Sequence, residues 1–144
     1  MKLSTRSRYG LRLMFRLALN YEKGSMQLSE IAKAEDISEK YLGQIVIQLK
    51  SSGLINSIRG AQGGYYLTNP PSSTTTREIV EALEGSLSPV DCLDNQECIR
   101  IAHCPTKRLW AMMGDKIKET LEGVKLSDLV DWSKKEDKNL AFTI

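Results

Sequence analysis

The chain has 144 residues, 41% of them hydrophobic, which suffices for one compact core with an extended appendage and gives no reason to expect several independent domains. No apolar run approaches the roughly 20 residues of a membrane helix, and the opening MKLSTRSRYG lacks the apolar centre of a signal peptide, so we expect a cytoplasmic protein with no membrane contact. Residues 1–77 hold 11 Lys and Arg against 5 Asp and Glu, whereas residues 78–144 hold 9 against 13, so only the first half is suited to approach a polyanion.

The first segment with a regular pattern predicts one amphipathic helix, because apolar side chains recur at every fourth position. These positions are Tyr9, Leu13, Leu17 and Tyr21. Four arginines lie among them and are suited to contact phosphates without reading sequence, namely Arg6, Arg8, Arg12 and Arg16. A solvated helix face is the alternative role of these arginines.

The following segment, LSEIAKAEDISEKYLGQIVIQLKSSGLI, has a helix-turn-helix pattern. Ser29 is placed to cap a short helix over residues 30–35, and Ser38 to cap a second helix that ends near Ser51. The second helix should turn its regularly spaced apolar residues toward the core, namely Leu42, Ile45, Val46 and Leu49. The side chains left outward are Ser38, Lys40, Tyr41, Gly43, Gln44 and Gln48.

The outward face of this second helix is the candidate reading surface, because the N-terminal part of a recognition helix is the part that meets bases. Ser, Tyr and Gln side chains are suited to hydrogen bonds with phosphates or base edges. The candidate DNA contacts on this helix are therefore Ser38, Lys40, Tyr41 and Gln44. An ordinary helical hairpin with a polar outer face is the alternative.

Two short strands rich in branched and aromatic residues follow at residues 54–58 and 65–67, joined by the glycine-rich tip RGAQGG. A two-stranded wing that presents an arginine is well shaped to enter a minor groove, where negative potential is focused. We therefore add Ser57, Arg59 and Gly60 to the candidate DNA contacts, with Arg59 as the groove contact. A phosphate-binding loop is the competing interpretation, but the spacing matches no nucleotide fingerprint.

Two adjacent prolines at 70 and 71 end the wing. We predict a winged helix-turn-helix DNA-binding domain over residues 1–71 and a sensor and dimerisation region over residues 72–144, a fold class that is mostly α with a small β-hairpin wing. In the second region the pattern predicts a short helix that starts at Thr76 and ends at Gly85, a long helix up to Gly123, and a short helix from Ser127 followed by a charged tail. The long helix carries an apolar stripe suited to pack on a second copy or to be buried within the monomer, namely Leu109, Met113, Ile117 and Leu121.

The candidate metal centre is the loop before the long helix, where the only three cysteines stand at the even spacing Cys-x5-Cys-x5-Cys. Three clustered thiols in a chain expected in a reducing compartment favour metal or redox chemistry over a structural disulfide. Thiolates prefer soft metals and iron-sulfur clusters. The candidate ligands are Cys92, Cys98 and Cys104.

Order, spacing and wing sequence together resemble the IscR-type family of winged helix-turn-helix regulators, which includes NsrR-like nitric oxide sensors and CymR-like cysteine-metabolism repressors. The resemblance covers almost the whole chain and is carried by LSTRSRYGLR, LSEIAKAEDISEKYLGQI, GLINSIRGAQGGYYL, EIVEALEGSLSPV and KLSDLVDW. It implies a DNA-binding transcriptional regulator, not an enzyme. It also implies a homodimer on a pseudo-palindromic operator, with the long helix at the dimer interface and the cysteine loop as the effector site.

The chain departs from this family pattern at three positions. Lys107 stands where cluster-binding members carry a histidine ligand, and Arg8 stands where NsrR-like members can supply an aspartate. A protonated Lys or Arg is a poor ligand, so neither ligand scheme transfers whole. Gly43 replaces a glutamate common in cluster-dependent relatives. The fourth ligand stays open among water, a small thiol, the partner subunit and His103, Asp91, Asp94 or Glu97.

We expect an iron-sulfur cluster on the three cysteines, 2Fe-2S rather than 4Fe-4S, whose loss would change operator occupancy by shifting the placement of the two winged domains. Three rival interpretations stay open: a structural zinc site on the same thiolates, a CymR-like repressor controlled by thiol redox or a protein partner, and a redox enzyme or electron carrier. The single histidine leaves no Ser-His or Cys-His relay with an orienting partner, which argues against catalysis.

Overall fold

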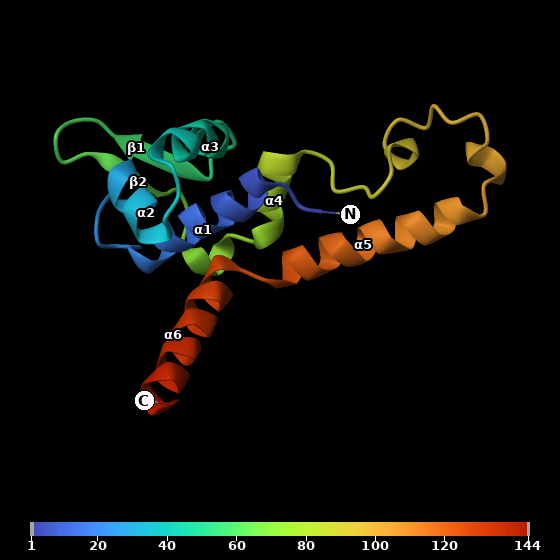
Figure 1. Ribbon diagram of the computed structural model, residues 1–144. Helices are drawn as coiled ribbons and strands as arrows, with labels where there is room; N and C mark the ends of the chain where they lie inside the picture. The colour runs from blue at the N-terminus through green and yellow to red at the C-terminus, as the bar shows by residue number, and fades with distance from the viewer. Residues whose placement is uncertain (1, 144) are drawn as a thin grey trace.

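The computed structural model describes residues 2–143, and the side chains of residues 2–141. Figure 1 shows a body made of helices α1 to α4 and a β-hairpin, a long arm formed by α5, and α6 descending from the junction of the two. The elements in chain order are α1 (Thr5–Leu19), α2 (Leu28–Glu35), α3 (Glu39–Ser51), β1 (Ile55–Ile58), β2 (Gly64–Leu67), η1 (Pro71–Ser73), α4 (Thr76–Glu84), η2 (Asp91–Leu93), η3 (Ile101–His103), α5 (Thr106–Gly123) and α6 (Leu126–Thr143). This mostly helical fold with a two-stranded antiparallel wing confirms the predicted fold class.

The core of the body is built around α1. The helix begins where the Ser4 hydroxyl accepts a hydrogen bond from the Ser7 backbone N–H at 3.2 Å, which satisfies one of the free donors of the first turn. Leu13 and Leu17 are buried as predicted, and the helix packs against α2, α3, α4, α6 and β2. Tyr21 lies beyond the end of the helix, so the predicted four-residue series holds only as far as Leu17.

The helix-turn-helix is confirmed, with one change at its first cap. The Glu30 carboxylate accepts a hydrogen bond from the Gln27 backbone N–H at 2.8 Å, so α2 begins at Leu28 and the expectation that Ser29 caps it is wrong. The turn passes through Asp36, whose φ of 52° is left-handed, a conformation that Asp tolerates better than most side chains. Ser38 caps α3 as predicted, and its hydroxyl accepts from the backbone N–H of Tyr41 at 3.3 Å.

The four predicted core residues of α3 are all buried, namely Leu42, Ile45, Val46 and Leu49. They pack with α1, α2, α4 and β1. Truncating one of these leucines to alanine typically costs about 2–5 kcal/mol, because it removes apolar contacts and leaves a cavity. The recognition helix is therefore fixed on the body by its whole inner face.

The wing is an antiparallel hairpin in which Ile55 pairs with Leu67 and Ser57 pairs with Tyr65. On its other edge, β2 is bonded to the segment before α2, because Tyr65 exchanges two backbone hydrogen bonds with Met26. A side chain at Gly64 would overlap the Met26 backbone, so this close approach requires glycine. Because β1 also packs on α3, the wing is attached to the body through both strands.

The arm is joined to the body at an elbow between α5 and α6. The backbone N–H of Thr76 donates to the Val124 carbonyl at 2.8 Å, and the N–H of Leu126 donates to the Thr74 carbonyl at 3.0 Å. The Thr76 hydroxyl also donates to the carbonyl of Leu121 at 2.8 Å. Because Leu126 is completely buried, the start of α6 belongs to the core of the body.

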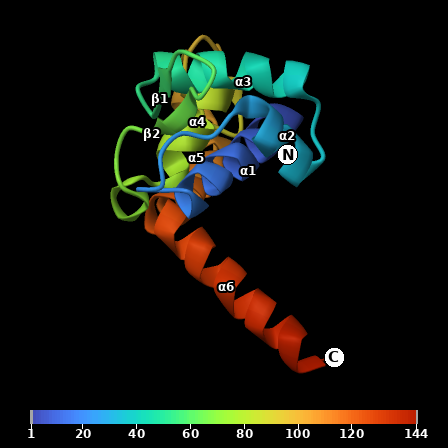
Figure 2. The same ribbon diagram turned by 90° about the vertical axis from the view of Figure 1, so that its left-hand side faces the viewer.

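Beyond this elbow, α5 runs away from the body (Figure 1), and α6 leaves it after its first turns have packed on α1 (Figures 1 and 2). The apolar stripe of α5 is incompletely covered, since Leu109 is 50% exposed, Met113 is 38% exposed and the neighbouring Met112 is 58% exposed. The predicted short helix from Ser127 is longer than expected, because α6 continues through the charged tail to Thr143. Within residues 2–143, no helix is long and apolar enough to cross a bilayer.

Candidate nucleic-acid interface and cysteine loop

The outward face of α3 presents the predicted reading residues. Lys40 and Gln44 are exposed, and Ser38 lies one residue before the helix. Tyr41 is half-buried because its ring meets the ring of Tyr9 edge-on, with centroids 5.8 Å apart and planes at 88°. This packing fixes the direction of Tyr41, which lowers the entropy that a contact through its hydroxyl would cost.

A hollow of about 500 Å³ at the N-terminal end of α3 is lined by residues of both α1 and α3. Thr5 and Tyr9 of α1 line it together with Lys40, Tyr41 and Gln44 of α3. The first N–H groups of a helix and a lysine ammonium both favour negative charge. The Asp36 carboxylate also lines the hollow, so the Lys40 ammonium is the charged group there that favours a phosphate.

The wing and the recognition helix are joined by a direct hydrogen bond. The Lys50 ammonium, in the last turn of α3, donates to the Ser57 hydroxyl in β1 at 2.6 Å. Ser57 is half-buried, so part of its role is to fix the wing against α3. Lys50 was not among the residues singled out from the sequence, although the sequence places a basic residue in the last turn of the helix directly before the first strand.

The wing tip presents an arginine on a tight turn. Arg59 is exposed and forms no ion pair with any side chain of residues 2–141. Gly60 adopts a φ of 118°, which favours glycine, and its carbonyl accepts from the N–H of Gly63 at 3.0 Å. The Gln27 amide donates to the Ala61 carbonyl at 3.0 Å. These two hydrogen bonds therefore hold the backbone of the tip, while the Arg59 side chain stays free to contact a ligand.

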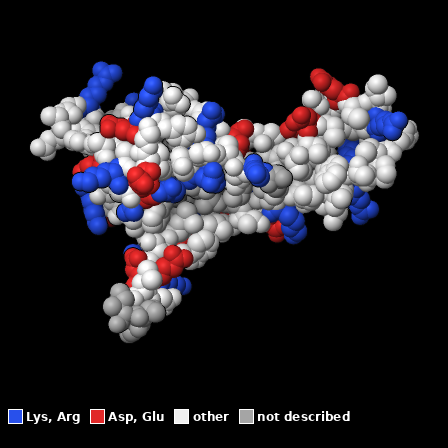
Figure 3. Space-filling view, in the orientation of Figure 1, with Lys and Arg blue, Asp and Glu red and all other residues white. Residues whose placement is uncertain are grey.

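Positive side chains project from the edge of the body that α3 and the hairpin form (Figure 3).

The α1 arginines divide into two groups. Arg12 and Arg16 form ion pairs with the buried Glu35 of α2 while their side chains stay partly exposed, so both are held to the body by a partner. Arg6 and Arg8 remain exposed near the start of the helix and keep the capacity for phosphate contacts. Sequence reasoning missed Glu35, because an ion pair between two helices leaves no local pattern.

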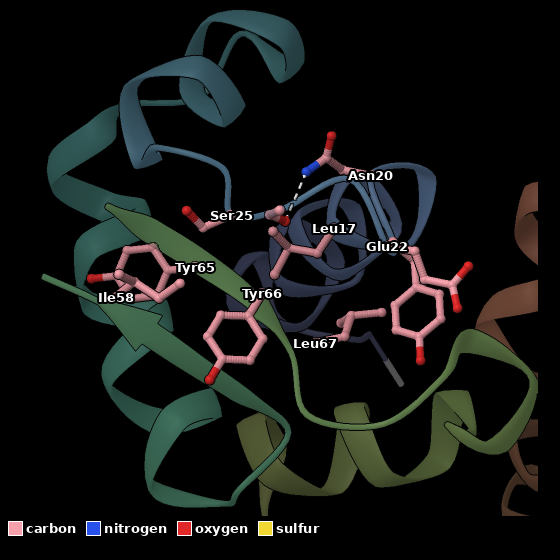
Figure 4. A pocket seen from close by; sticks show the side chains of 10 residues that line it. Leu17, Asn20, Glu22, Ser25, Ile58, Tyr65, Tyr66 and Leu67 are labelled. Carbon is pink, nitrogen blue, oxygen red and sulfur yellow. Dashed lines mark hydrogen bonds between the residues drawn. The ribbon is translucent and has the colours of Figure 1, made fainter. Parts of the chain in front are cut away.

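A mainly apolar pocket of about 310 Å³ lies beside the wing, between the hairpin and the turn after α1. Figure 4 shows Leu17, Tyr66 and Leu67 around it, and the Asn20 amide, which donates to the Gly24 carbonyl at 3.1 Å, closes the turn at its rim. The pocket is therefore lined by the end of α1, the turn that follows it and both strands of the wing.

The cysteine loop lies at the far end of the arm, away from the body (Figure 1). All three cysteines are free thiols; Cys98 is exposed, and Cys92 and Cys104 are half-buried. The two turns η2 and η3 are the loop's only regular structure. The loop also packs on α5, because a Cβ at Gly114 would lie 3.1 Å from Cδ of Pro89.

The donor set of this loop does not form a metal site in the described part of the chain. No group of three or more His, Cys, Asp or Glu side chains within residues 2–141 is close enough to hold an ion. Asp94, one of the candidate fourth ligands, is engaged with Ser88, whose hydroxyl donates to it at 2.6 Å. The residues as placed therefore do not fit a cluster, and the iron-sulfur centre stays a prediction.

The Cys104 thiol lies at the entry to α5, where several donors surround the sulfur. The Thr106 hydroxyl, 3.2 Å from Sγ, and the backbone N–H of Lys107 lower the pKa of Cys104 below its ordinary value. A lowered pKa increases the thiolate fraction at neutral pH, and the thiolate is both the nucleophile and the metal ligand. These contacts therefore favour the thiolate form of Cys104.

Comparison with known proteins agrees with this geometry. The Rrf2 family model, described as an iron-dependent transcriptional regulator, matches residues 3–132. The chain is 41% identical over 145 residues to the HTH-type transcriptional regulator CymR of Bacillus subtilis (strain 168), covering 100% of both chains. It is 33% identical over 131 residues to IscR of Escherichia coli O1:K1 / APEC, covering 91% of this chain and 81% of that protein.

Two solved structures share the fold. The structure of B. subtilis CymR matches with a TM-score of 0.79 and covers 92% of this chain and 98% of that chain. T. potens IscR matches with a TM-score of 0.78 at 33% identity and covers 94% and 90%. The matched relatives are transcriptional regulators and not enzymes, in agreement with the prediction. The helix-turn-helix, the wing and these similarities over nearly the full length show that the chain belongs to the Rrf2 family of transcriptional regulators.

Proposed function

We propose that this regulator acts as a homodimer on a pseudo-palindromic operator, with α3 in the major groove and the wing in the adjacent minor groove. The observation that carries the proposal is the joined surface of α3 and the wing. Its inner side is fixed by the core, its two halves are tied by the Lys50–Ser57 hydrogen bond, and its outer side presents Lys40, Gln44 and Arg59 to solvent.

The reading residues divide by chemistry. Gln44 can form a bidentate pair with adenine in the major groove, and Tyr41 and Ser38 can donate to phosphates or base edges. Lys40 supplies a phosphate contact at the hollow beside α1. On the wing, Arg59 enters the minor groove, where narrow A/T-rich sequence concentrates negative potential, while Gly60 allows the tip to turn and Ser57 holds β1 against α3.

Dimerisation through α5 is supported by the uncovered apolar side chains of the arm. Leu109, Met112 and Met113 are all at least 38% exposed, and two copies of such a stripe can cover each other in an antiparallel pair of helices. A dimer would present two recognition helices to the same face of DNA. Half-sites about one helical turn or a multiple of it apart, roughly 34–36 Å per turn, follow from this arrangement.

The effector is proposed to act at Cys92, Cys98 and Cys104. The family description as iron-dependent supports the predicted iron-sulfur cluster. Two observations support the alternative in which the thiols themselves are the input. The three thiols are free and do not converge with other ligands. One relative that matches over 100% of both chains is CymR, whose structure is described as that of the global cysteine regulator. We place thiol chemistry first and the cluster second.

The experiment for DNA binding is a fluorescence-anisotropy titration of a duplex from the protein's own promoter, with an unrelated duplex of equal length as competitor. We expect selective binding that falls steeply with salt, because several Lys and Arg side chains displace counterions. Arg59→Ala should weaken binding to A/T-rich flanks, whereas Lys138→Ala, an exposed charge on α6, should not. Equal effects of the two substitutions would contradict the placement of the wing.

The experiment for the effector uses protein purified without oxygen, with iron, sulfide and zinc measured per chain beside the visible spectrum. Colourless, metal-free protein whose operator affinity changes with peroxide and recovers with dithiothreitol supports the thiol input. Brown protein with iron and sulfide in near-equal amounts would establish the cluster instead, and stoichiometric zinc would make the loop structural. Replacement of all three cysteines by serine should abolish the response in either sensing case.

A further inference from the structure

We propose that Ile47 reads the C5-methyl group of a thymine in the operator and so contributes to sequence choice. This inference rests on the proposed function, in which α3 lies in the major groove. It concerns a residue outside the predicted contact set, which contained only the polar and glycine positions of the outward face. Ile47 is an exposed, branched aliphatic side chain in the middle of the proposed reading surface.

The position of Ile47 on α3 follows from helix geometry. At about 3.6 residues per turn, the buried stripe of Leu42, Ile45, Val46 and Leu49 defines one side of the helix. The opposite side carries Lys40, Gln44, Ile47 and Ser51, and all four are exposed. Ile47 follows Gln44 by three residues, so their side chains are neighbours along the outer face, with Cβ atoms about 5–6 Å apart.

The exposure of Ile47 has no explanation within the described part of the chain. Its side chain is 69% exposed, whereas the other large aliphatic residues of α3 are at most 4% exposed. The elements that pack on α3 are α1, α2, α4 and β1, and Ile47 is absent from the apolar cluster that they form. A β-branched residue is also a poorer choice than a polar straight-chain residue for an exposed helix position.

The surroundings of Ile47 identify what can cover it. Lys40, Gln44 and Lys50 are exposed around it, so the surface is polar and does not form an apolar patch for a protein partner. In the major groove, the thymine C5-methyl is the apolar group among the base edges. An isoleucine pressed on cytosine N4 or adenine N6 would instead remove water from a donor without replacing its hydrogen bond. Thymine is therefore favoured by its methyl contact, and cytosine and adenine are disfavoured by the loss of water from their amino groups.

The size of the effect follows from the size of one methyl group. Burying one such group contributes about a fourfold change in affinity. The test uses the promoter duplex in which each thymine of a half-site is replaced in turn by deoxyuridine, which lacks only this methyl. With wild-type protein, one thymine per half-site should show a roughly fourfold loss of affinity on replacement.

The matched variants are Ile47→Ala and Leu140→Ala. Leu140 is a similarly exposed aliphatic residue, 64% exposed on α6, away from the reading surface. Ile47→Ala should bind the thymine and deoxyuridine duplexes equally at that position, while Leu140→Ala should keep the wild-type difference. Because Ile47 makes no core contact and Ala favours helix more than Ile, Ile47→Ala should unfold at the wild-type temperature or slightly above it, which circular dichroism can verify.

The outcomes separate this inference from the function on which it rests. Selective operator binding without any methyl-dependent thymine, or an undiminished deoxyuridine effect in Ile47→Ala, would overturn the role of Ile47 and leave DNA binding by α3 intact. Absence of selective binding by wild-type protein to its own promoter would contradict the proposed function itself, and the role of Ile47 with it.

Discussion

Glu35→Gln is the perturbation that tests most directly how the helix-turn-helix is held on the body. Glu35 is 8% exposed and accepts hydrogen bonds from Arg12, at 2.7 Å, and from Arg16. A hydrogen bond to a charged group contributes about 1.5–3 kcal/mol, but the Arg12 and Arg16 side chains are 46% and 35% exposed, so solvent screening reduces each contribution. The two bonds together should therefore stabilise the fold by about 2–3 kcal/mol.

Glu35→Gln keeps the shape of the side chain and removes its charge, so the loss should reflect the two ion pairs. Urea unfolding followed by far-UV circular dichroism should show a lower midpoint with an unchanged slope, and the melting temperature should fall by about 5–10 °C. The control is Glu22→Gln, an exposed carboxylate without an ion-pair partner among residues 2–141, which should shift stability by less than about 0.5 kcal/mol. Equal midpoints for the two variants would refute the stabilising role of the Arg12–Glu35–Arg16 group.

Three further predictions concern the wing, the arm and acid stability. Arg59→Ala should reduce the slope of log affinity against log salt by about one per subunit, and an unchanged slope would argue against a phosphate or groove contact. Replacing Leu109 and Met113 by lysine should convert a dimer to a monomer in sedimentation experiments, and an unchanged mass would exclude α5 as the interface. The Ser4 and Ser7 hydroxyls hold the pKa of Glu84 below its ordinary value, so its stabilising contribution is full above the unfolded pKa and is lost as pH falls through the lower folded value. Glu84→Gln should therefore show a flatter loss of stability on acidification, and an acid limb identical to wild type would contradict this role.

The elements of the body were predictable because their signals are local. The spacing of Leu42, Ile45, Val46 and Leu49, the cap at Ser38 and the glycines of the wing each act within a few residues, and all lie where expected. The cap of α2 was misplaced, because Ser29 has the better N-cap chemistry whereas the structure uses Glu30 one turn into the helix. The helix from Ser127 was expected to be short and to be followed by a charged tail, yet α6 continues through that tail, since Lys, Glu and Ala favour helix without an apolar pattern.

The candidate site was predictable in part. The outward position of Lys40 and Gln44 followed from periodicity, but the same geometry also exposes Ile47, an apolar residue that hydrogen-bonding chemistry does not single out. The ion pairs of Glu35 join residues 23 and 19 positions apart, and such pairings arise only from the packing of α1 on α2. The cysteine loop was expected to form a metal centre, but its only helical segments are two three-residue turns, so sequence spacing alone did not place the three thiols relative to one another.

We propose that the joined surface of α3 and the wing binds an operator selectively. The most direct measurement is the affinity ratio between a duplex from the protein's own promoter and an unrelated duplex, for wild type and for Gln44→Ala, at one physiological salt concentration. We expect a wild-type ratio of about 10³ or more, and a clearly smaller ratio for Gln44→Ala, because each lost bidentate base contact removes about 1–3 kcal/mol of discrimination. A wild-type ratio near one, or a ratio unchanged by Gln44→Ala, would contradict it.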